Sequence, residues 1–419
     1  MSHSPRTRTV LSCTVLVAAL GVGATACGDS GGHPLAGRPY DAAGQVAFNA
    51  PSGSKEADPD KPLEIVSKGG ESRITDVSAT DSLGRHLAGA LSADGARWHS
   101  TSPLAANAQY TVRVSTENSD GDPGRKTLEM RTGDGGKKRL KVSFGPEKGT
   151  YGVGQPLTAT LSAPVKDKAS RAVVERSLSV ESTPAVQGSW YWVDSKNLHY
   201  RPKTYWPARS KVRLSSNLDG VKVTGDLRGG PSEPLTLGFG DRIEAVVDSA
   251  NHDMTVRRNG KVVESFPVTT GKPGFDTRNG IKVILGKESF VRMRSGSVGI
   301  AAGSSESYDL PVYWATRVTW SGEYVHAAPW SVGSQGSANT SHGCVGMSTE
   351  NAHRFFDTVQ RGDIVEVVGS DGERMTPFDN GFGDWNLSWK KWQEGSAIRG
   401  SGHNTAPGAV EPARLRPGV

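Results

Sequence analysis

The sequence has very little cysteine. Only three cysteines occur in 419 residues, and two of them, Cys13 and Cys27, lie in the N-terminal segment. If that segment is a signal with a lipidated cysteine, Cys344 is the one free thiol of the mature chain and no intrachain disulfide can form. An unpaired thiol outside the cell is open to oxidation, so its presence favours a catalytic task.

The sequence also lacks runs of basic residues and has few long apolar runs. Its formal net charge of +6 is spread along the chain, which argues against nucleic acid as a partner and suits attraction to an anionic cell envelope. Its 52 glycines and 24 prolines indicate many short strands and turns. The length allows about two to four domains, and we expect a mainly β protein.

The N-terminus has the features of a bacterial export signal. Basic residues precede the apolar run Val10–Val22, and the small residues Ala24-Thr25-Ala26 stand directly before Cys27. This pattern predicts a signal peptide over residues 1–26 and resembles a lipobox, in which the cysteine becomes residue one and is acylated. The small, polar residues 27–53 would then form a flexible tether. We expect a lipoprotein on the outer face of the cytoplasmic membrane that acts in the cell wall; a simply secreted protein is the alternative.

Residues 54–137 and 138–240 resemble each other. Each segment has a Pro-Leu pair that opens a strand, a tryptophan near its middle, Trp98 or Trp192, and a later alternating strand such as Tyr110–Val114. Segments of about 100 residues with this pattern fit two immunoglobulin-like sandwiches. Because these segments lack cysteine, packing of the hydrophobic core must stabilise them without a disulfide. We expect both tryptophans in the cores rather than in ligand sites.

Residues 241–369 have a different pattern. Strand-like segments flank Asn259-Gly260, a strong signal for a two-residue hairpin. Further on, Ser348 can cap a helix with apolar residues at helical spacing, which Gly362 can end. Ile364–Val368 then closes the sheet. We expect a compact β-rich domain with one clear helix.

The C-terminal part is a short extension followed by a polar tail. Within residues 370–395, Trp385, Trp389 and Trp392 are spaced so that a helix would place all three on one face. We expect this face to pack on the catalytic domain, with stacking on sugars as the alternative. Residues 396–419 are small, polar and proline-containing, which predicts a disordered tail.

Histidine and cysteine recur within one short stretch of the third domain. His326 lies in the segment Tyr324–Trp330, and Ser341-His342-Gly343-Cys344 follows after a Gly/Ser/Asn-rich loop. A free thiol has a pKa of about 8.5, so a nearby imidazole is needed to take its proton, and we expect His326 to be that base. Its second ring nitrogen would donate to a backbone carbonyl, since Ala327 offers no side-chain oxygen.

The neighbours of the thiol add further candidates. His342 stands two residues from Cys344 and would line the pocket or tune the thiolate. The backbone N–H groups of Gly343 and Cys344 are candidates for an oxyanion hole. Two other interpretations stay open. One is a buried, inert cysteine with a structural histidine. The other is a zinc site of His326, His342 and Cys344, although their spacing lacks the usual structural-zinc signature.

These residues resemble the signature of the L,D-transpeptidases of YkuD type, which cross-link peptidoglycan. The resemblance spans residues 241–395, and the order of the domains is similar to the membrane-anchored multidomain branch of that family. One position departs from the pattern, because the family commonly has asparagine two residues after the cysteine and this sequence has Gly346. The segments that carry the resemblance are Thr270–Lys272, Thr277–Gly280, Trp314–Thr316, His326–Gly333, Ser341–Cys344, Arg361–Val365 and Gly383–Asn386.

The resemblance implies a mechanism and a set of contacts. Cys344 would attack the third residue of a peptidoglycan stem peptide and release the terminal D-Ala. The acyl group would then pass through a thioester to an amine of a second stem, giving a 3→3 cross-link without cofactor or metal. Carbapenems would acylate the same thiol. The stem peptide would lie near His342 and contact Met293, Tyr308, Trp330, Ser331 and Ser341.

Other functions stay open on the sequence alone. The domain could be an L,D-carboxypeptidase, or a transferase that attaches proteins to the stem. In a different class, Gly346 could mark a decayed site in a non-catalytic lipoprotein that binds the wall. Under each interpretation, the two Ig-like domains would hold the third domain away from the membrane, at the depth of the wall.

Overall fold

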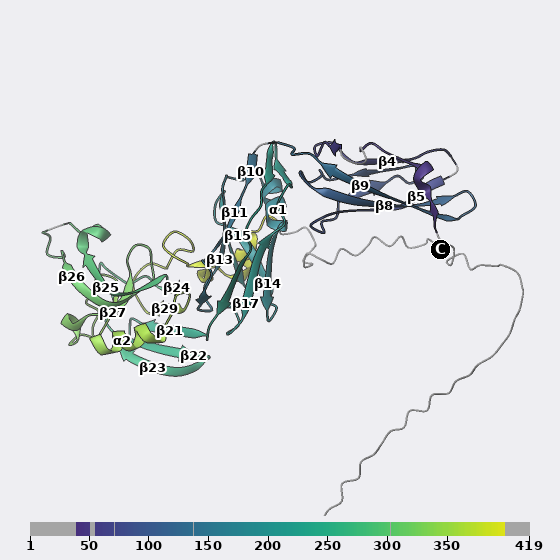
Figure 1. Ribbon diagram of the computed structural model, residues 1–419. Coiled ribbons are helices and arrows are strands. Elements are labelled where there is room, and N and C mark those ends of the chain that lie inside the picture. Colours follow the sequence, from purple (N-terminus) through teal and green to yellow (C-terminus); the bar gives the residue numbers. More distant parts are fainter. Residues whose placement is uncertain (1–38, 51–54, 71, 137, 302, 399–419) are drawn as a thin grey trace, which may run out of the picture.

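The computed structural model describes residues 39–50, 55–70, 72–136, 138–301 and 303–398. Three β-rich domains follow one another in space in the order of the sequence (Figure 1). The predicted signal peptide, Cys27 and the first part of the predicted tether lie outside the described residues, as does the tail from residue 399. Within the described ranges, no helix is long and apolar enough to cross a membrane.

The first domain is a sandwich of two sheets. Its core includes Trp98, which is buried as predicted. One sheet has the order β1-β9-β8-β5, with β3 also paired to β9, and the other has the order β2-β4-β7-β6. The elements are β1 (Tyr40–Asp41), the 3-10 turn η1 (Ala42–Gly44), β2 (Val46–Phe48), β3 (Glu56–Ala57), β4 (Glu64–Ser67), β5 (Ser72–Asp81), β6 (Gly89–Leu91), β7 (Arg97–Ser100), β8 (Gln109–Asn118) and β9 (Pro123–Thr132).

The first sandwich begins earlier than the sequence suggested. Strand β1 pairs with β9 and β2 pairs with β4, while Ala42 and Val46 are buried. Residues 40–48 therefore belong to the folded domain, and the prediction of a tether running to residue 53 is wrong for them. These strands are too short for a periodic pattern to identify them.

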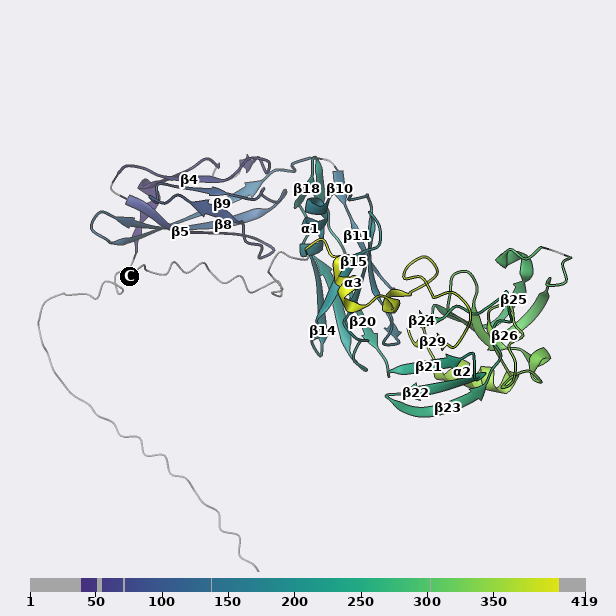
Figure 2. The same ribbon diagram turned by 180° about the vertical axis from the view of Figure 1, so that it is seen from behind.

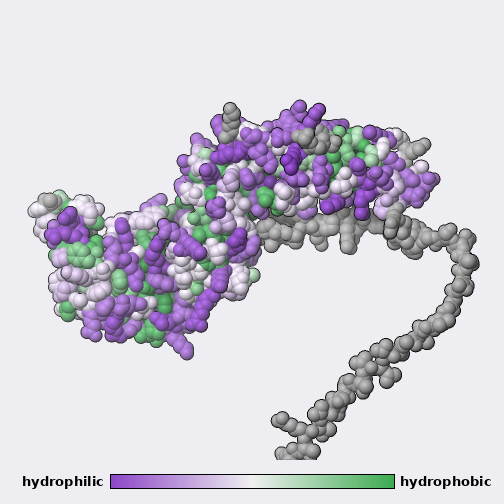
Figure 3. All heavy atoms as spheres, viewed as in Figure 1, coloured by the Kyte–Doolittle hydropathy of each residue, from purple (hydrophilic) through white to green (hydrophobic). Residues whose placement is uncertain are grey.

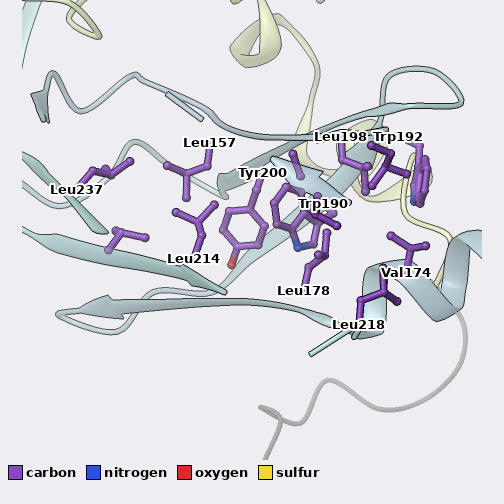
Figure 4. Close-up of a cluster of buried hydrophobic side chains, with 14 of the residues drawn as sticks. Leu157, Val174, Leu178, Trp190, Trp192, Leu198, Tyr200, Leu214, Leu218 and Leu237 are labelled. Atoms are coloured by element: carbon purple, nitrogen blue, oxygen red, sulfur yellow. The ribbon is translucent and has the colours of Figure 1, made fainter. Parts of the chain in front are cut away.

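The second domain is a sandwich whose core is rich in aromatic side chains; Figure 4 shows part of this core. Trp190, Trp192 and Tyr200 fill the space between its sheets, which confirms the buried position predicted for Trp192. The sheets have the orders β11-β13-β16-β15 and β12-β20-β17-β14, with a small sheet β10-β19-β18. The elements are β10 (Lys138–Leu140), β11 (Val142–Gly145), β12 (Thr150–Tyr151), β13 (Leu157–Leu161), α1 (Lys168–Arg176), β14 (Leu178–Thr183), β15 (Gly188–Trp192), β16 (Asn197–Pro202), β17 (Lys211–Ser216), β18 (Lys222–Thr224), β19 (Leu227–Gly229) and β20 (Leu235–Phe239).

The third domain packs two sheets against each other and against one helix. The sheets have the orders β23-β22-β21-β29-β24 and β25-β26-β27-β28. The predicted hairpin is present, with Asn259 and Gly260 both at positive φ. The elements are β21 (Ile243–Asp248), β22 (Asp253–Arg258), β23 (Lys261–Pro267), β24 (Gly280–Val283), β25 (Gly286–Arg294), η2 (Ser295–Val298), β26 (Asp309–Arg317), β27 (Tyr324–Ala327), η3 (Pro329–Ser331), β28 (Val345–Met347), α2 (Thr349–Thr358) and β29 (Ile364–Val368).

Helix α2 is the helix predicted after the cysteine. The side chain of Ser348 accepts a hydrogen bond from the backbone N–H of Asn351, so it is the N-cap that the sequence indicated. Ala352 and Phe355 are buried on the face toward the sheets. The closing strand β29 lies between β21 and β24, parallel to the first and antiparallel to the second.

The C-terminal extension joins the second and third domains. It contains η4 (Asp384–Asn386) and α3 (Trp389–Glu394), and α3 lies beside β15 of the second sandwich (Figure 2). Asn386 accepts a hydrogen bond from the N–H of Ile281 in the third domain. The guanidinium of Arg201, from the second domain, lies within 6 Å of the ring centroids of all three tryptophans of the extension.

Two predictions about this extension are corrected. The face formed by its tryptophans lies on the second sandwich, because Arg201 and Tyr191 supply an apolar and cationic surface there. Other residues of the extension contact the catalytic domain as predicted: the N–H of Met375 donates to the carbonyl of Asn279, and the side-chain amide of Asn386 donates to the carbonyl of Ile281. Residues 396–398 do not belong to a disordered tail, since Ser396 Oγ and the N–H of Ala397 donate to the buried carboxylate of Glu175. Elsewhere the face seen in Figure 3 is largely hydrophilic, with small hydrophobic areas between.

Candidate active site

Strand pairing brings the predicted nucleophile and base together. Strands β27 and β28 are parallel, with Val325 opposite Val345 and His326 opposite Gly346. Cys344 comes directly before β28, so it lies at the same level as Tyr324, at the start of the strand that carries His326. The pairing of β27 with β28 therefore brings Cys344 and His326, 18 positions apart in the sequence, to the same end of the strand pair, where both line one cleft.

Cys344 and His326 line a single cleft of about 420 Å³. All but one of the predicted site residues line it, the exception being Gly343. Residues that the sequence analysis did not anticipate supply the remaining wall, because only the fold shows which side chains face the cleft. The predicted members are Met293, Tyr308, His326, Trp330, Ser331, Ser341, His342 and Cys344; the additional ones are Thr269, Val298, Leu310, Val312, Gly322, Ala328, Ser334, Thr340 and Gly346.

The thiol of Cys344 is half-buried and protonated at rest. Its Sγ lies 3.6 Å from the carbonyl oxygen of Gly322, to which the S–H donates. Burial raises the pKa of the Cys344 thiol to about 12, and the Glu323 carboxylate adds to this, while the backbone N–H of Tyr324 and the Lys282 ammonium oppose it. Near neutral pH the sulfur keeps its proton, so any attack by this thiol would need a base.

His326 is buried, with 5% of its surface exposed. Its Nδ1 lies 2.8 Å from the carbonyl oxygen of Ala327, which confirms the expected backbone acceptor. Since a carbonyl can only accept, Nδ1 carries the hydrogen and Nε2 is left with a lone pair. Burial lowers the pKa of His326, so the imidazole is neutral and able to take a proton.

His342 lies at the mouth of the cleft in a charged group. Its Nε2 is 2.6 Å from Oε2 of Glu306, and the same oxygen accepts from Lys272 Nζ at 2.5 Å. The rings of Phe275 and Tyr308 flank the imidazole at centroid distances of 4.7 and 5.2 Å. Hydrogen bonds from Lys272 and then His342 hold the pKa of the Glu306 carboxyl below its usual value. His342 thus lines the wall as predicted, and Glu306 is its partner.

Comparison with known proteins agrees with this geometry. The sequence profile of the L,D-transpeptidase catalytic domain (YkuD) matches residues 242–367, and that of a bacterial Ig domain matches residues 54–222. L,D-transpeptidase 2 of Mycobacterium tuberculosis is 32% identical over 400 residues, covering 94% of this chain and 96% of that protein. The chain belongs to the L,D-transpeptidase family. The family inferred from the motif is therefore confirmed, as is the mainly β architecture with an Ig-like region before the catalytic domain.

Other members of the family match about half of the chain. L,D-transpeptidase 1 of M. tuberculosis is 40% identical over 231 residues, covering 54% of this chain and 84% of that protein. A solved structure of an L,D-transpeptidase, LdtMt1, in complex with imipenem is 39% identical, with a TM-score of 0.47, and covers 54% of this chain and 99% of that chain.

The cysteine loop of this L,D-transpeptidase is fixed by its own hydrogen bonds. The N–H of Gly343, predicted as an oxyanion donor, donates to Ser341 Oγ at 3.1 Å, and Ser341 Oγ donates to the carbonyl of Cys344 at 2.6 Å. Thr277 Oγ1 donates to the carbonyl of Gly343 at 2.9 Å. Gly343 has a φ of +114°, a conformation that L-residues with a side chain rarely adopt. In the resting structure this glycine shapes the turn before the nucleophile.

Gly346 occupies the position where the family commonly has asparagine. A Cβ added there would lie 2.9 Å from Thr269 Cγ2 and 3.1 Å from Ala328 Cβ. The backbone of Gly346 also pairs with Thr269 through two hydrogen bonds. In this L,D-transpeptidase the backbone of residue 346 is closely packed where a Cβ would stand, and Gly346 lines the cleft.

The described residues do not form the zinc site that the sequence left open as an alternative. Across the residues that the structure describes, no group of three or more His, Cys, Asp or Glu side chains is placed to hold a metal ion. His326 uses Nδ1 for Ala327, and His342 uses Nε2 for Glu306.

Proposed function

We propose that this protein forms 3→3 cross-links between stem peptides through a thioester on Cys344. The observation that carries the proposal is a neutral thiol and a neutral imidazole lining one cleft, with the imidazole fixed in the tautomer that can accept a proton. This is the arrangement that nucleophilic acyl transfer needs. The cleft volume of about 420 Å³ suits a short peptide.

The first step acylates the enzyme. Sγ of Cys344 attacks the carbonyl of the third stem residue while its proton passes to Nε2 of His326. The C–N bond to the terminal D-Ala then breaks, and the amine leaves with the proton that the imidazole held. The thioester and a neutral imidazole remain.

The second step transfers the acyl group. The side-chain amine of a diamino acid in another stem attacks the thioester carbonyl and gives a proton to His326. The C–S bond breaks, the thiol takes the proton back, and the new amide is the cross-link. Water would compete with the amine, so the partly enclosed cleft favours transfer over hydrolysis.

Replacement of the nucleophile tests this proposal. We expect Cys344→Ala to yield no 3→3 dimers from purified muropeptides carrying tetrapeptide stems, with the wild type run in parallel. Dimer formation by this variant would overturn the assignment. Mass spectrometry of the products with and without an acceptor stem separates transpeptidation from L,D-carboxypeptidase activity, which gives tripeptide and no dimer. Adding a candidate protein acceptor tests the transfer of proteins to the stem.

A carbapenem provides a test that needs no peptidoglycan. We propose that Cys344 opens the strained β-lactam amide in the same way, giving an acyl adduct on sulfur. Intact-mass measurement should show one carbapenem added to the wild type and none to Cys344→Ala. A wild-type protein without an adduct would favour the non-catalytic, wall-binding alternative.

We also propose that residues 1–26 are removed as a signal peptide and that Cys27 is acylated, which would anchor the protein on the outer face of the cytoplasmic membrane. The support is the apolar run followed by small residues and a cysteine. Detergent phase separation of the wild type and of Cys27→Ser tests this proposal, because only the acylated chain should enter the detergent phase. Equal partition of both would leave a simply secreted protein.

A further inference from the structure

A buried ion pair lies beside the nucleophile and takes no part in the mechanism above. Lys282, on β24, has no exposed surface, and its Nζ lies 2.8 Å from Oε2 of Glu323. Strand β24 and the turn before β27 belong to different sheets, so the pair joins the two sheets of the catalytic domain. Lysine is rarely buried completely unless a charge pairs with it.

Glu323 is held in place from several sides. Its Oε1 accepts from the N–H and from a guanidinium N–H of Arg278, at 3.2 and 3.0 Å. Its own N–H donates to Thr319 Oγ1 at 2.8 Å. For Lys282 Nζ and Glu323 Oε2, the described part of the chain offers no hydrogen-bond partner beyond their mutual ion pair. Two cations therefore pair with this carboxylate, and Lys282 Nζ pairs with its Oε2.

The residues on either side of Glu323 contact the thiol. The carbonyl of Gly322 accepts the S–H of Cys344, and the backbone N–H of Tyr324 acts on the sulfur from the next residue. The ion pair is thus attached to the short turn that touches the nucleophile. A change in that turn would move both backbone groups at once.

The two charges act on the thiol in opposite directions. The Glu323 carboxylate raises the pKa of the Cys344 thiol and the Lys282 ammonium lowers it. Burial lowers the pKa of Lys282 itself, while Glu323 and the sulfur oppose that shift. Other ionisable groups near the sulfur are the phenols of Tyr308 and Tyr324, whose pKa values burial raises, and the imidazole of His326.

We propose that Lys282 is a positioning residue for the nucleophile: paired with Glu323 beneath the cleft, its ammonium offsets the carboxylate and sets how readily Cys344 gives up its proton. This inference rests on the proposed function, in which Cys344 is the nucleophile. Lys282 does not touch the substrate and acts through the turn and through its charge. A buried carboxylate beside the thiol without this ammonium would hold the proton on sulfur more strongly.

Alkylation of Cys344 by iodoacetamide tests the inference in the full chain. Mass spectrometry of the Cys344 peptide gives the rate as a function of pH, and this rate follows thiolate formation whether or not any stem peptide is transferred. Its outcome is therefore separate from the muropeptide experiment. We expect Lys282→Met to alkylate about tenfold more slowly than the wild type at each pH between 7 and 9, because the Glu323 carboxylate, still paired with Arg278, then acts on the thiol without the opposing ammonium.

Lys287→Met is the matched control. Lys287 is a half-buried lysine of the same domain that donates to the carbonyl of Val359 and does not act on the thiol. It should leave the alkylation rate unchanged. Glu323→Gln, which keeps an oxygen for Arg278, should alkylate at the wild-type rate or faster. A slower rate in Glu323→Gln, or an unchanged rate in a folded Lys282→Met, would overturn the inference.

A double variant decides the question if Lys282→Met does not fold. Lys282→Met with Glu323→Leu replaces the buried pair by apolar side chains, a change that proteins often tolerate. Because both opposing charges leave together, we expect alkylation no more than about threefold slower than in the wild type. A tenfold loss in the folded double variant would show that the turn, and not the balance of charge, governs the thiol, and would overturn the inference.

Discussion

The floor and the rim of the cleft differ in how they handle charge. The floor consists of the half-buried Cys344 and the buried His326. It holds two neutral groups, because burial raises the pKa of the thiol and lowers that of the imidazole. The rim, His342 with Glu306 and Lys272, is partly exposed and holds polar groups that are hydrogen-bonded to one another. The floor thus suits the proton transfer that we propose, whereas the rim links two segments of the cleft wall.

The rim also joins two loops. Glu306 comes from the segment between η2 and β26, at the end of the molecule far from the sandwiches (Figure 1), whereas His342 precedes the nucleophile. Charges near the mouth of a site help to position a polar substrate, but a charge on the floor would have to be desolvated. Changes at the floor should therefore reduce the chemical step strongly, and changes at the rim should mainly affect binding.

Removing the base from the floor should have the largest effect. We expect His326→Gln to reduce kcat for cross-linking by about 10²–10⁴-fold, the usual contribution of a general base, because glutamine cannot take the thiol proton. The acylation rate with a carbapenem measures the same step. Iodoacetamide alkylation, which starts from the thiolate, should change little and serves as the control. A loss of less than tenfold would contradict the role of His326.

The protonation state of the floor gives the next effect. Because the pKa of Cys344 is raised to about 12, the thiolate fraction is small at neutral pH and grows about tenfold per pH unit. Iodoacetamide alkylation of the wild type should therefore rise about a hundredfold between pH 7 and pH 9 without levelling off. A plateau below pH 9 would instead indicate a thiolate–imidazolium pair at rest. Carbapenem acylation should depend less on pH, since His326 takes the proton there.

The sequence predicted the floor better than the rim. Cys344 and His326 lie in a motif, and local patterns identified the Asn259-Gly260 hairpin and the Ser348 cap. The partners of His342 could not be found this way, since Glu306 is 36 positions away and nothing near it marks a contact. Lys282 looks like any lysine of a strand until the fold buries it. Ion pairs between distant segments leave no periodic signal.

Local sequence patterns also could not predict two parts of the fold. The strands of residues 40–48 are too short to show alternation. The spacing of Trp385, Trp389 and Trp392 predicts that they are buried, but not which domain covers them. That choice depends on Arg201, almost 200 positions earlier, whose guanidinium the three rings surround.

Tight packing of the floor predicts a moderate effect at Gly346. Gly346→Asn would place its Cβ against Thr269 and Ala328, so we expect a loss of about 1–3 kcal/mol in unfolding free energy and roughly tenfold slower carbapenem acylation. Thermal unfolding and intact-mass kinetics measure the two effects. Adding Thr269→Ser, which removes the clashing methyl group and keeps the hydroxyl, should restore part of both. A gain of activity in Gly346→Asn would support a decayed site in the present chain.

The smallest effect is expected at the rim. Glu306→Gln removes the carboxylate to which Lys272 and His342 both hydrogen-bond. The loop between η2 and β26 should then be bound less tightly to the segments that carry Lys272 and His342. We expect KM for the stem peptide to rise about two- to fivefold with kcat nearly unchanged, because exposed ion pairs contribute little. The pKa of Glu306 is lowered, so its carboxylate is ionised at every pH above the ordinary pKa of a carboxyl group. The contribution of this charge is lost as the pH falls through the lowered pKa. The difference between variant and wild type should therefore vanish at acidic pH.

Glu373→Gln is the control, because Glu373 is an exposed carboxylate that does not line the cleft. A large fall in kcat for Glu306→Gln alone would show that the rim takes part in the chemistry and that the two regions are not separate.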